Sequence, residues 1–123
     1  MQFALLIYDD EKVWAGLSED DQNAIMGEYF AYTDELRKAG AHRGGEALQP
    51  ISSARSLRVR DGDRIVTDGP FAETKEQFGG FYLIDVDSQE DALDWAARIP
   101  SARLGTIEIR PVVVFDREPA AAS

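Results

Sequence analysis

Cysteine is absent from this chain, and His42 is its single histidine. Without cysteine there is no disulfide, no thiolate nucleophile and no cysteine-based zinc or iron–sulfur site. The scattered carboxylates have no recognised ligand spacing, so we expect no bound metal. The pairs Gly44-Gly45 and Gly79-Gly80 lack the spacing of phosphate-binding and dinucleotide-binding loops, so we also expect no nucleotide cofactor.

Positive charge is scarce as well. The chain has 13 basic residues against 23 acidic ones, a formal net charge of -10. Nucleic acids and anionic membranes repel such a chain on average, so direct nucleic-acid binding is not expected. No window approaches the roughly 20 consecutive apolar residues of a membrane span, and the N-terminus has no signal-peptide pattern. We therefore expect a cytoplasmic protein without a membrane association.

The chain does have enough apolar sequence for a core. Its 123 residues are 44% hydrophobic and 10% aromatic, which suits one compact domain. We expect this domain to span residues 1–115. Residues 116–123 have no apolar period, and we expect them to form a flexible C-terminal tail.

Two helices are predicted from capping residues and apolar spacing. Ser18, with Asp21 three residues later, gives a capping-box-like start for a helix over 19–39. Ser88 opens a second helix, which Pro100 ends.

Strands and a hairpin are predicted between and around these helices. The apolar run at 3–8 is typical of a central strand, and further strands are predicted at 80–86 and 106–115. Residues 56–60 and 64–67 flank the turn Asp61-Gly62-Asp63 and predict a β-hairpin.

This order of elements predicts an α+β fold of the ferredoxin-like, split βαβ plan. Its antiparallel sheet carries both helices on one face, and the hairpin is an insertion. The other face of the sheet is then bare, yet residues 81–84 and 112–115 are apolar toward both faces. A homodimer with its sheets packed face to face would cover that surface; the alternative is a monomer with an unusually apolar exposed sheet.

A charged, turn-prone loop, Asp68-Gly69-Pro70-Phe71 with residues 72–76, runs directly into the apolar strand that follows Gly79. Asp-Gly-Pro favours a rigid corner, because Gly tolerates left-handed backbone and Pro fixes its own. Asp68 then either caps the turn through its own backbone or has a chemical role. A carboxylate held beside an apolar pocket can have a pKa raised toward a useful value.

Residues 68–76 with 79–82 closely resemble the DGPF subgroup of the YCII-related domain family. The resemblance extends to 5–8, 45–48, 96–100 and 108–112, and so covers nearly the whole chain. It implies a ferredoxin-like fold that pairs as a dimeric α/β barrel. It implies no settled biochemical function.

The wider family places a His on the first helix beside an Asp near the Asp-Gly turn, and one branch uses this pair to eliminate chloride from a chlorinated hydroxyquinone. The resemblance assigns the Asp to Asp68, but Tyr29 stands where the His is expected. Tyrosine, with a reference pKa of about 10, is a poor base, although it can donate a hydrogen bond or act as an acid. Tyr29 is otherwise a core tyrosine on the apolar stripe of its helix.

Four other side chains are candidates for the site. His42 either enters a cleft or faces solvent just beyond the first helix. Lys75 and Glu76 either bind a small polar ligand beside Asp68 or are simply solvated. Arg110 either pairs with a carboxylate such as Asp85 or Glu108, or anchors an anion at the sheet.

Two function classes follow from these residues. In the first, the protein binds a small organic molecule in a cleft with Asp68 and Tyr29 at its polar end, and performs cofactor-free elimination or isomerisation. In the second, it is a non-enzymatic regulatory or interaction module. Proteins that resemble this subgroup occur fused to or encoded beside sigma factors, which implies a sigma-factor-type partner facing the acidic surface.

Overall fold

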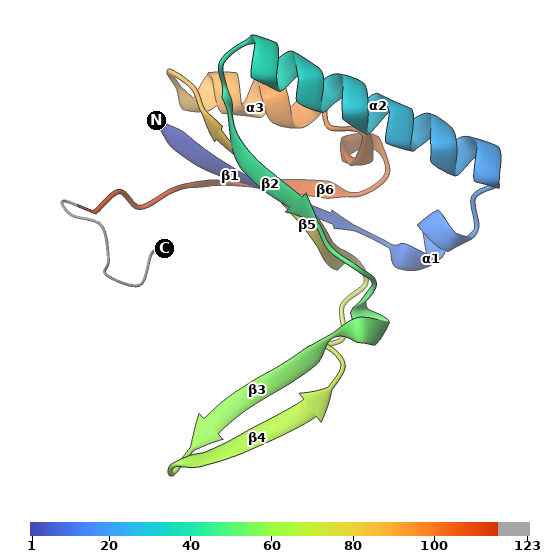
Figure 1. The fold of residues 1–123 in the computed structure, drawn as a ribbon, viewed down its shortest axis with the longest axis vertical. Helices are drawn as coiled ribbons and strands as arrows, with labels where there is room; N and C mark the ends of the chain where they lie inside the picture. Colours follow the sequence, from blue (N-terminus) through green and yellow to red (C-terminus); the bar gives the residue numbers. More distant parts are fainter. Residues whose placement is uncertain (116–123) are drawn as a thin grey trace.

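The chain folds into a four-stranded antiparallel sheet with two helices on one face and a separate β-hairpin (Figure 1). The computed structural model describes residues 1–115. Its elements are, in chain order, β1 (Gln2–Asp9), α1 (Glu11–Ala15), α2 (Glu19–Lys38), β2 (His42–Ala47), the 3₁₀ turn η1 (Ile51–Ser53), β3 (Arg55–Arg60), β4 (Asp63–Asp68), β5 (Gln77–Asp85), α3 (Gln89–Ala97), the 3₁₀ turn η2 (Pro100–Arg103) and β6 (Thr106–Pro111).

The strand order in the main sheet is β2-β5-β1-β6, and every neighbouring pair is antiparallel. The strand order is compatible with the ferredoxin-like plan, in which each helix connects two strands that are not neighbours. β1 is a central strand, as its unbroken apolar run predicts. In the part of the chain that the structure describes, no helix is long and apolar enough to cross a membrane.

Both predicted helices begin at a serine cap. The Ser18 hydroxyl accepts a hydrogen bond from the Asp21 N–H at 3.1 Å, and the Ser88 hydroxyl accepts one from the Asp91 N–H at 3.2 Å. Each cap satisfies a backbone donor that the first helical turn leaves free. Beyond α2, Gly40 adopts a φ of 73°, the left-handed conformation that commonly ends a helix.

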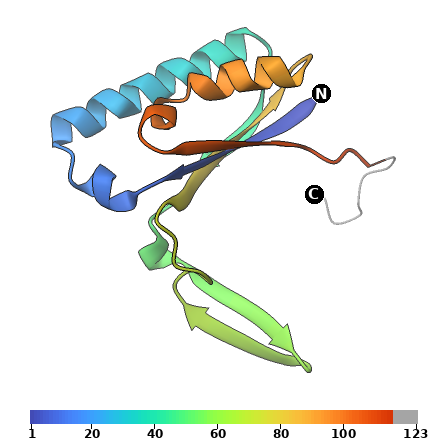
Figure 2. The ribbon, with the colours of Figure 1, turned by 180° about the vertical axis from the view of Figure 1, so that it is seen from behind.

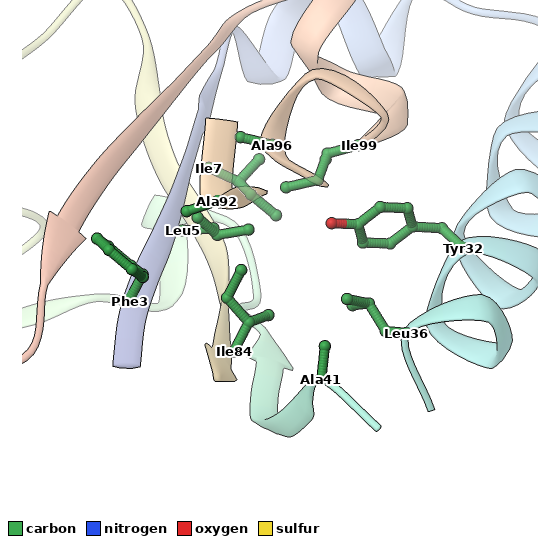
Figure 3. Close-up of a cluster of buried hydrophobic side chains, with 10 residues drawn as sticks. All are labelled: Phe3, Leu5, Ile7, Tyr32, Leu36, Ala41, Ile84, Ala92, Ala96 and Ile99. Carbon is green, nitrogen blue, oxygen red and sulfur yellow. The ribbon is translucent and has the colours of Figure 1, made fainter. Parts of the chain in front are cut away.

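The hydrophobic core lies between the sheet and the two helices (Figure 3). Alternate residues of β1 point into it, and the small residues of α3 let that helix approach the sheet closely. Burying one large apolar side chain of this kind contributes about 1.5–3 kcal/mol. The buried members are Phe3, Leu5, Ile7, Tyr32, Leu36, Ala41, Ile84, Ala92, Ala96 and Ile99.

The opposite face of the sheet carries apolar side chains but no described helix (Figures 1 and 2). Register pairs Leu6 with Phe81 and Ala4 with Leu83, so these four side chains share that face. All four are only partly buried. The uncovered sheet face, as we call these residues, is the one that the predicted ferredoxin-like plan leaves bare.

The predicted hairpin is present as β3 and β4, which form a separate two-stranded sheet within residues 1–115. Its turn uses Asp61 and Gly62, both at positive φ, as a type I′ two-residue turn requires. Figures 1 and 2 show the hairpin projecting from the end of the sheet, on the side away from α2 and α3. We call β3 and β4 together the arm.

Three features differ from the prediction. β2 and α1 were not predicted, because β2 is a glycine-containing edge strand and α1 is a single capped turn with five residues. The last strand was predicted over 106–115 but ends at Pro111, because β1 begins at Gln2 and leaves 113–115 without a strand to pair with. The predicted tail, 116–123, lies outside the described residues.

Candidate functional site

Three side chains from separate elements form a hydrogen-bonded chain at one end of the sheet. The Tyr29 hydroxyl of α2 lies 2.6 Å from the Ser101 hydroxyl of η2. The same Ser101 hydroxyl lies 3.2 Å from Oδ2 of Asp9, at the end of β1. Because an ionised carboxylate only accepts hydrogen bonds, Ser101 donates to Asp9 and Tyr29 donates to Ser101. The chain therefore directs two hydroxyl donors, in series, toward the Asp9 carboxylate.

Glycines make room for Asp9. A Cβ at Gly105 would lie 2.9 Å from the Asp9 Cα, too close for any side chain without a backbone shift. A Cβ at Gly79 would lie 3.6 Å from Asp9 Oδ1, an ordinary van der Waals contact. Gly79 therefore leaves Oδ1 less crowded on that side, while Oδ2 binds Ser101.

The surroundings of Asp9 raise the pKa of its carboxyl group above the ordinary value. Partial burial is the largest cause, and the nearby carboxylates of Glu11, Glu76 and Asp10 act in the same direction. The hydrogen bond from Ser101 opposes these effects, because it stabilises the charged form. Asp9 accordingly accepts a proton more readily than an exposed aspartate.

Burial also raises the pKa of Tyr29, and the Asp9 charge adds to the effect while the Ser101 hydrogen bond opposes it. The phenol therefore keeps its proton at neutral pH and can act as the first donor of the chain. A second contact fixes this part of α2: the Thr33 hydroxyl donates to the Tyr29 carbonyl at 2.9 Å and lies 2.9 Å from the Tyr82 hydroxyl. Ser101 itself is only 4% exposed.

Comparison with known proteins assigns the family. The model of the YCII-related domain matches residues 1–116. The chain belongs to the YCII-related family. This YCII-related protein is also 39% identical over 117 residues to an uncharacterised protein of Rhizobium meliloti (strain 1021), a match that covers 94% of each chain. The predicted family membership is confirmed.

Two of the six predicted site residues of the YCII-related protein lie in or near this chain of hydrogen bonds. Tyr29 is its first donor. Glu76 accepts a hydrogen bond from the Thr106 hydroxyl at 2.8 Å, and its charge contributes to the raised pKa of Asp9.

The other four lie elsewhere in the chain. Asp68 ends β4 with its side chain 94% exposed, and its carboxylate lies 3.3 Å from Nε of Arg55. His42 begins β2 and packs edge to face on the Tyr82 ring, with centroids 6.4 Å apart. Lys75 is exposed in the loop before β5. Within one chain, the structure does not bring Asp68 or His42 to Tyr29.

Arg110 is exposed in β6 and lies in register with Ala4, on the uncovered sheet face. Asp85, one of its predicted partners, instead pairs with Arg43 at 3.6 Å and with the Met1 amino group at 3.0 Å. Glu108, the other, accepts a hydrogen bond from the Tyr8 hydroxyl at 3.3 Å.

Sequence reasoning missed Asp9 and Ser101. Asp9 carried a usable signal, since it is the first acidic residue after the apolar run 3–8, but an acidic run is more often a solvated surface. Ser101 follows Pro100 in no recognisable motif. Both become visible only when η2 is placed against the end of β1.

The chemistry open to this arrangement is the acceptance, holding and donation of a proton. Within residues 1–115 there is no group of three or more His, Cys, Asp or Glu residues that converges on a point as metal ligands do. A groove of about 440 Å³ lies between α2 and η2, but its arginines, Arg98 and Arg103, pair with Glu35 and Glu28. The hydrogen-bonded chain ending at Asp9 is therefore the better candidate site.

Proposed function

We propose that this YCII-related protein performs cofactor-free proton transfer on a small organic molecule, as an isomerase or a lyase, with Asp9 as the proton acceptor. The observation that supports this most is the chain Tyr29–Ser101–Asp9, which ends on a carboxyl group of raised pKa. A general base works best when its pKa lies close to the working pH, and burial raises an aspartate in that direction.

Each residue has a distinct part in this proposal. Asp9 Oδ1 takes a proton from an acidic C–H or O–H bond of the ligand, while Ser101 holds Oδ2. In an isomerisation the proton returns to another atom of the same molecule; in an elimination an anion leaves with its bonding electrons. Tyr29 is a positioning residue, because its hydroxyl contacts Ser101 and so acts on Asp9 indirectly.

Asp9 replaces Asp68 as the reactive carboxylate in this proposal. Asp68 is 94% exposed on the arm side of the molecule, and its carboxylate pairs with Arg55 at 3.3 Å, away from the Tyr29–Ser101 hydrogen bond. Asp68 remains the rival candidate, and the two aspartates provide a matched pair of variants.

The test is proton exchange with solvent. Three proteins, the wild type, Asp9→Asn and Asp68→Asn, are incubated in D₂O with a panel of small hydroxylated and chlorinated ring compounds. Deuterium uptake by the compounds is followed by NMR, and released chloride is measured by titration. We expect the wild type and Asp68→Asn to react alike, and Asp9→Asn to lose about 10²- to 10⁴-fold in rate. Loss in Asp68→Asn with full activity in Asp9→Asn would reverse the assignment, and no reaction in any protein would remove the enzyme proposal.

We also propose that the protein works as a homodimer whose sheets pack face to face. The support is the uncovered sheet face, where Leu6, Phe81 and Leu83 lie in a partly exposed apolar cluster. A second copy covers such a face with its own, since a two-fold interface pairs like surfaces.

A second candidate function is a binding module for a protein partner of the sigma-factor type. One observation favours it: Phe30 is 70% exposed and Met26 is 41% exposed, one turn apart on the acidic helix α2. Binding of a purified basic partner of this type, weakened by salt and by Phe30→Ser, would support this function. Binding that ignores both changes would contradict it.

A further inference from the structure

The arm has an apolar stripe that remains about half exposed among the described residues. Leu57, Val59 and Val66 lie on one face of the hairpin and are 55%, 57% and 44% exposed. A lone two-stranded hairpin is at best marginally stable in water, and it needs a further surface to pack against. The arm therefore requires a partner surface that its own domain does not supply.

A second exposed apolar segment of the described chain lies at the other end of the sheet. Val113, Val114 and Phe115 follow β6 and are 71%, 75% and 65% exposed. We call them the 113–115 segment. It leaves the sheet where β1 begins, whereas the arm starts where β1 ends, and Figures 1 and 2 show the two well apart. Within one chain of this structure, the arm therefore lies away from the 113–115 segment.

Charge favours another copy of this chain as the partner. Residues 55–68 contain four arginines and three aspartates, a net charge of +1 in a chain of net charge -10, so the remainder carries -11. The arm is thus the cationic part of an acidic protein. Opposite charges steer the arm toward the body of a second copy and away from the second arm.

The position of the arm also favours a second copy of this chain as the partner. The arm projects on the side of the sheet that α2 and α3 leave free, which is also the side of the uncovered sheet face (Figures 1 and 2). A copy stacked on that face lies beside the arm. We propose that the apolar stripe of the arm packs on the 113–115 segment of a second copy, and that two-fold symmetry makes the exchange reciprocal. This inference rests on the proposed homodimer.

Cross-linking tests the proposal cleanly, because the natural chain has no cysteine. The variant Val59→Cys/Val114→Cys is treated at low concentration with a short bismaleimide and run on a denaturing gel. We expect most of the protein to move to twice the chain mass and no ladder beyond it, because a reciprocal exchange closes at two copies. The matched control is Arg58→Cys/Val114→Cys, since Arg58 points to the opposite face of the same strand. It should stay mostly at the mass of one chain.

Light scattering of the untreated variants separates this inference from the homodimer. A dimer that cross-links through position 59 and not through position 58 supports both the homodimer and the arm exchange. A dimer in which the two positions cross-link equally, or not at all, overturns the arm exchange and leaves the homodimer standing. A ladder of higher masses contradicts reciprocal exchange, and a monomer overturns both proposals.

Discussion

At the scale of single residues, Asp9 is the group whose chemistry depends most on its surroundings. Its folded-state pKa is raised above the unfolded value of 3.8, so the folded protein binds the Asp9 proton more tightly than the unfolded chain does. The stability that this proton contributes is complete below pH 3.8 and is lost as the pH rises through the raised folded-state value.

We therefore predict that Asp9→Asn is more stable than the wild type at neutral pH, and that this advantage disappears below pH 3.8. Urea unfolding at both pH values measures the difference. The control, Asp87→Asn, removes one negative charge from an exposed position and should change stability little at either pH. An advantage of Asp9→Asn that is equal at both pH values would show that the carboxyl group is not perturbed.

Ser101 joins the two ends of the hydrogen-bonded chain. In Ser101→Ala the Asp9 carboxylate and the Tyr29 hydroxyl both lose this partner, so we expect a loss of about 1–3 kcal/mol in the free energy of unfolding. Urea unfolding at neutral pH checks this, with Ser52→Ala in the exposed turn η1 as control. Equal stability of the two variants would mean that the hydrogen bonds contribute nothing.

Of these residues, the sequence alone pointed to Tyr29. It lies on a helix that spacing and capping predict, and a resemblance marks its position. Asp9 and Ser101 are 92 residues apart in the chain, and only tertiary packing brings them together. No local pattern encodes such a pair, and the more conspicuous Asp68 occupies an exposed corner instead.

Among the secondary-structure elements, some glycines have room for a side chain and others do not. Gly27 lies in the exposed middle of α2, where a Cβ would meet nothing within 4 Å. Gly27→Ala should therefore raise the free energy of unfolding by about 0.5–1 kcal/mol, because alanine loses less backbone entropy in a helix. Thermal unfolding measures this.

Gly105→Ala provides the opposing case. Its Cβ would collide with the Tyr8 carbonyl and lie 2.9 Å from the Asp9 backbone, so the variant should be less stable than the wild type. If Gly105→Ala were as stable as Gly27→Ala, the close approach of residue 105 to the end of β1 would be wrong.

The elements that could be predicted are those with strong local signals. Ser18 and Ser88 mark the starts of α2 and α3, and Asp61-Gly62 marks the turn of the arm. β2 gives no such signal, because its stability comes from pairing with β5 and not from its own residues. The end of β6 was likewise fixed by the length of its partner strand.

For the molecule as a whole, the uncovered sheet face is the surface on which the proposed homodimer depends. Leu6 lies at its centre, in register with Phe81. In Leu6→Glu an unpaired charge would be buried in the proposed dimer, at a cost of about 3 kcal/mol or more, which is roughly a factor of 100 in Kd.

We expect Leu6→Glu to be a folded monomer under conditions in which the wild type is a dimer, as measured by light scattering with circular dichroism as the check on folding. The control is Phe30→Glu, which adds the same charge to the exposed surface of α2 and should remain dimeric. A monomeric wild type, or a dimeric Leu6→Glu, would rule out packing through this face.

Whether Asp9 is a carboxyl group prepared to accept a proton can be measured by NMR titration of its side-chain carboxyl. We expect a pKa above the ordinary value of 3.8 in the wild type, and a further rise in Ser101→Ala, because the hydrogen bond from Ser101 lowers the pKa of Asp9. A wild-type pKa at or below 3.8 would mean that Asp9 is not prepared to act as a base.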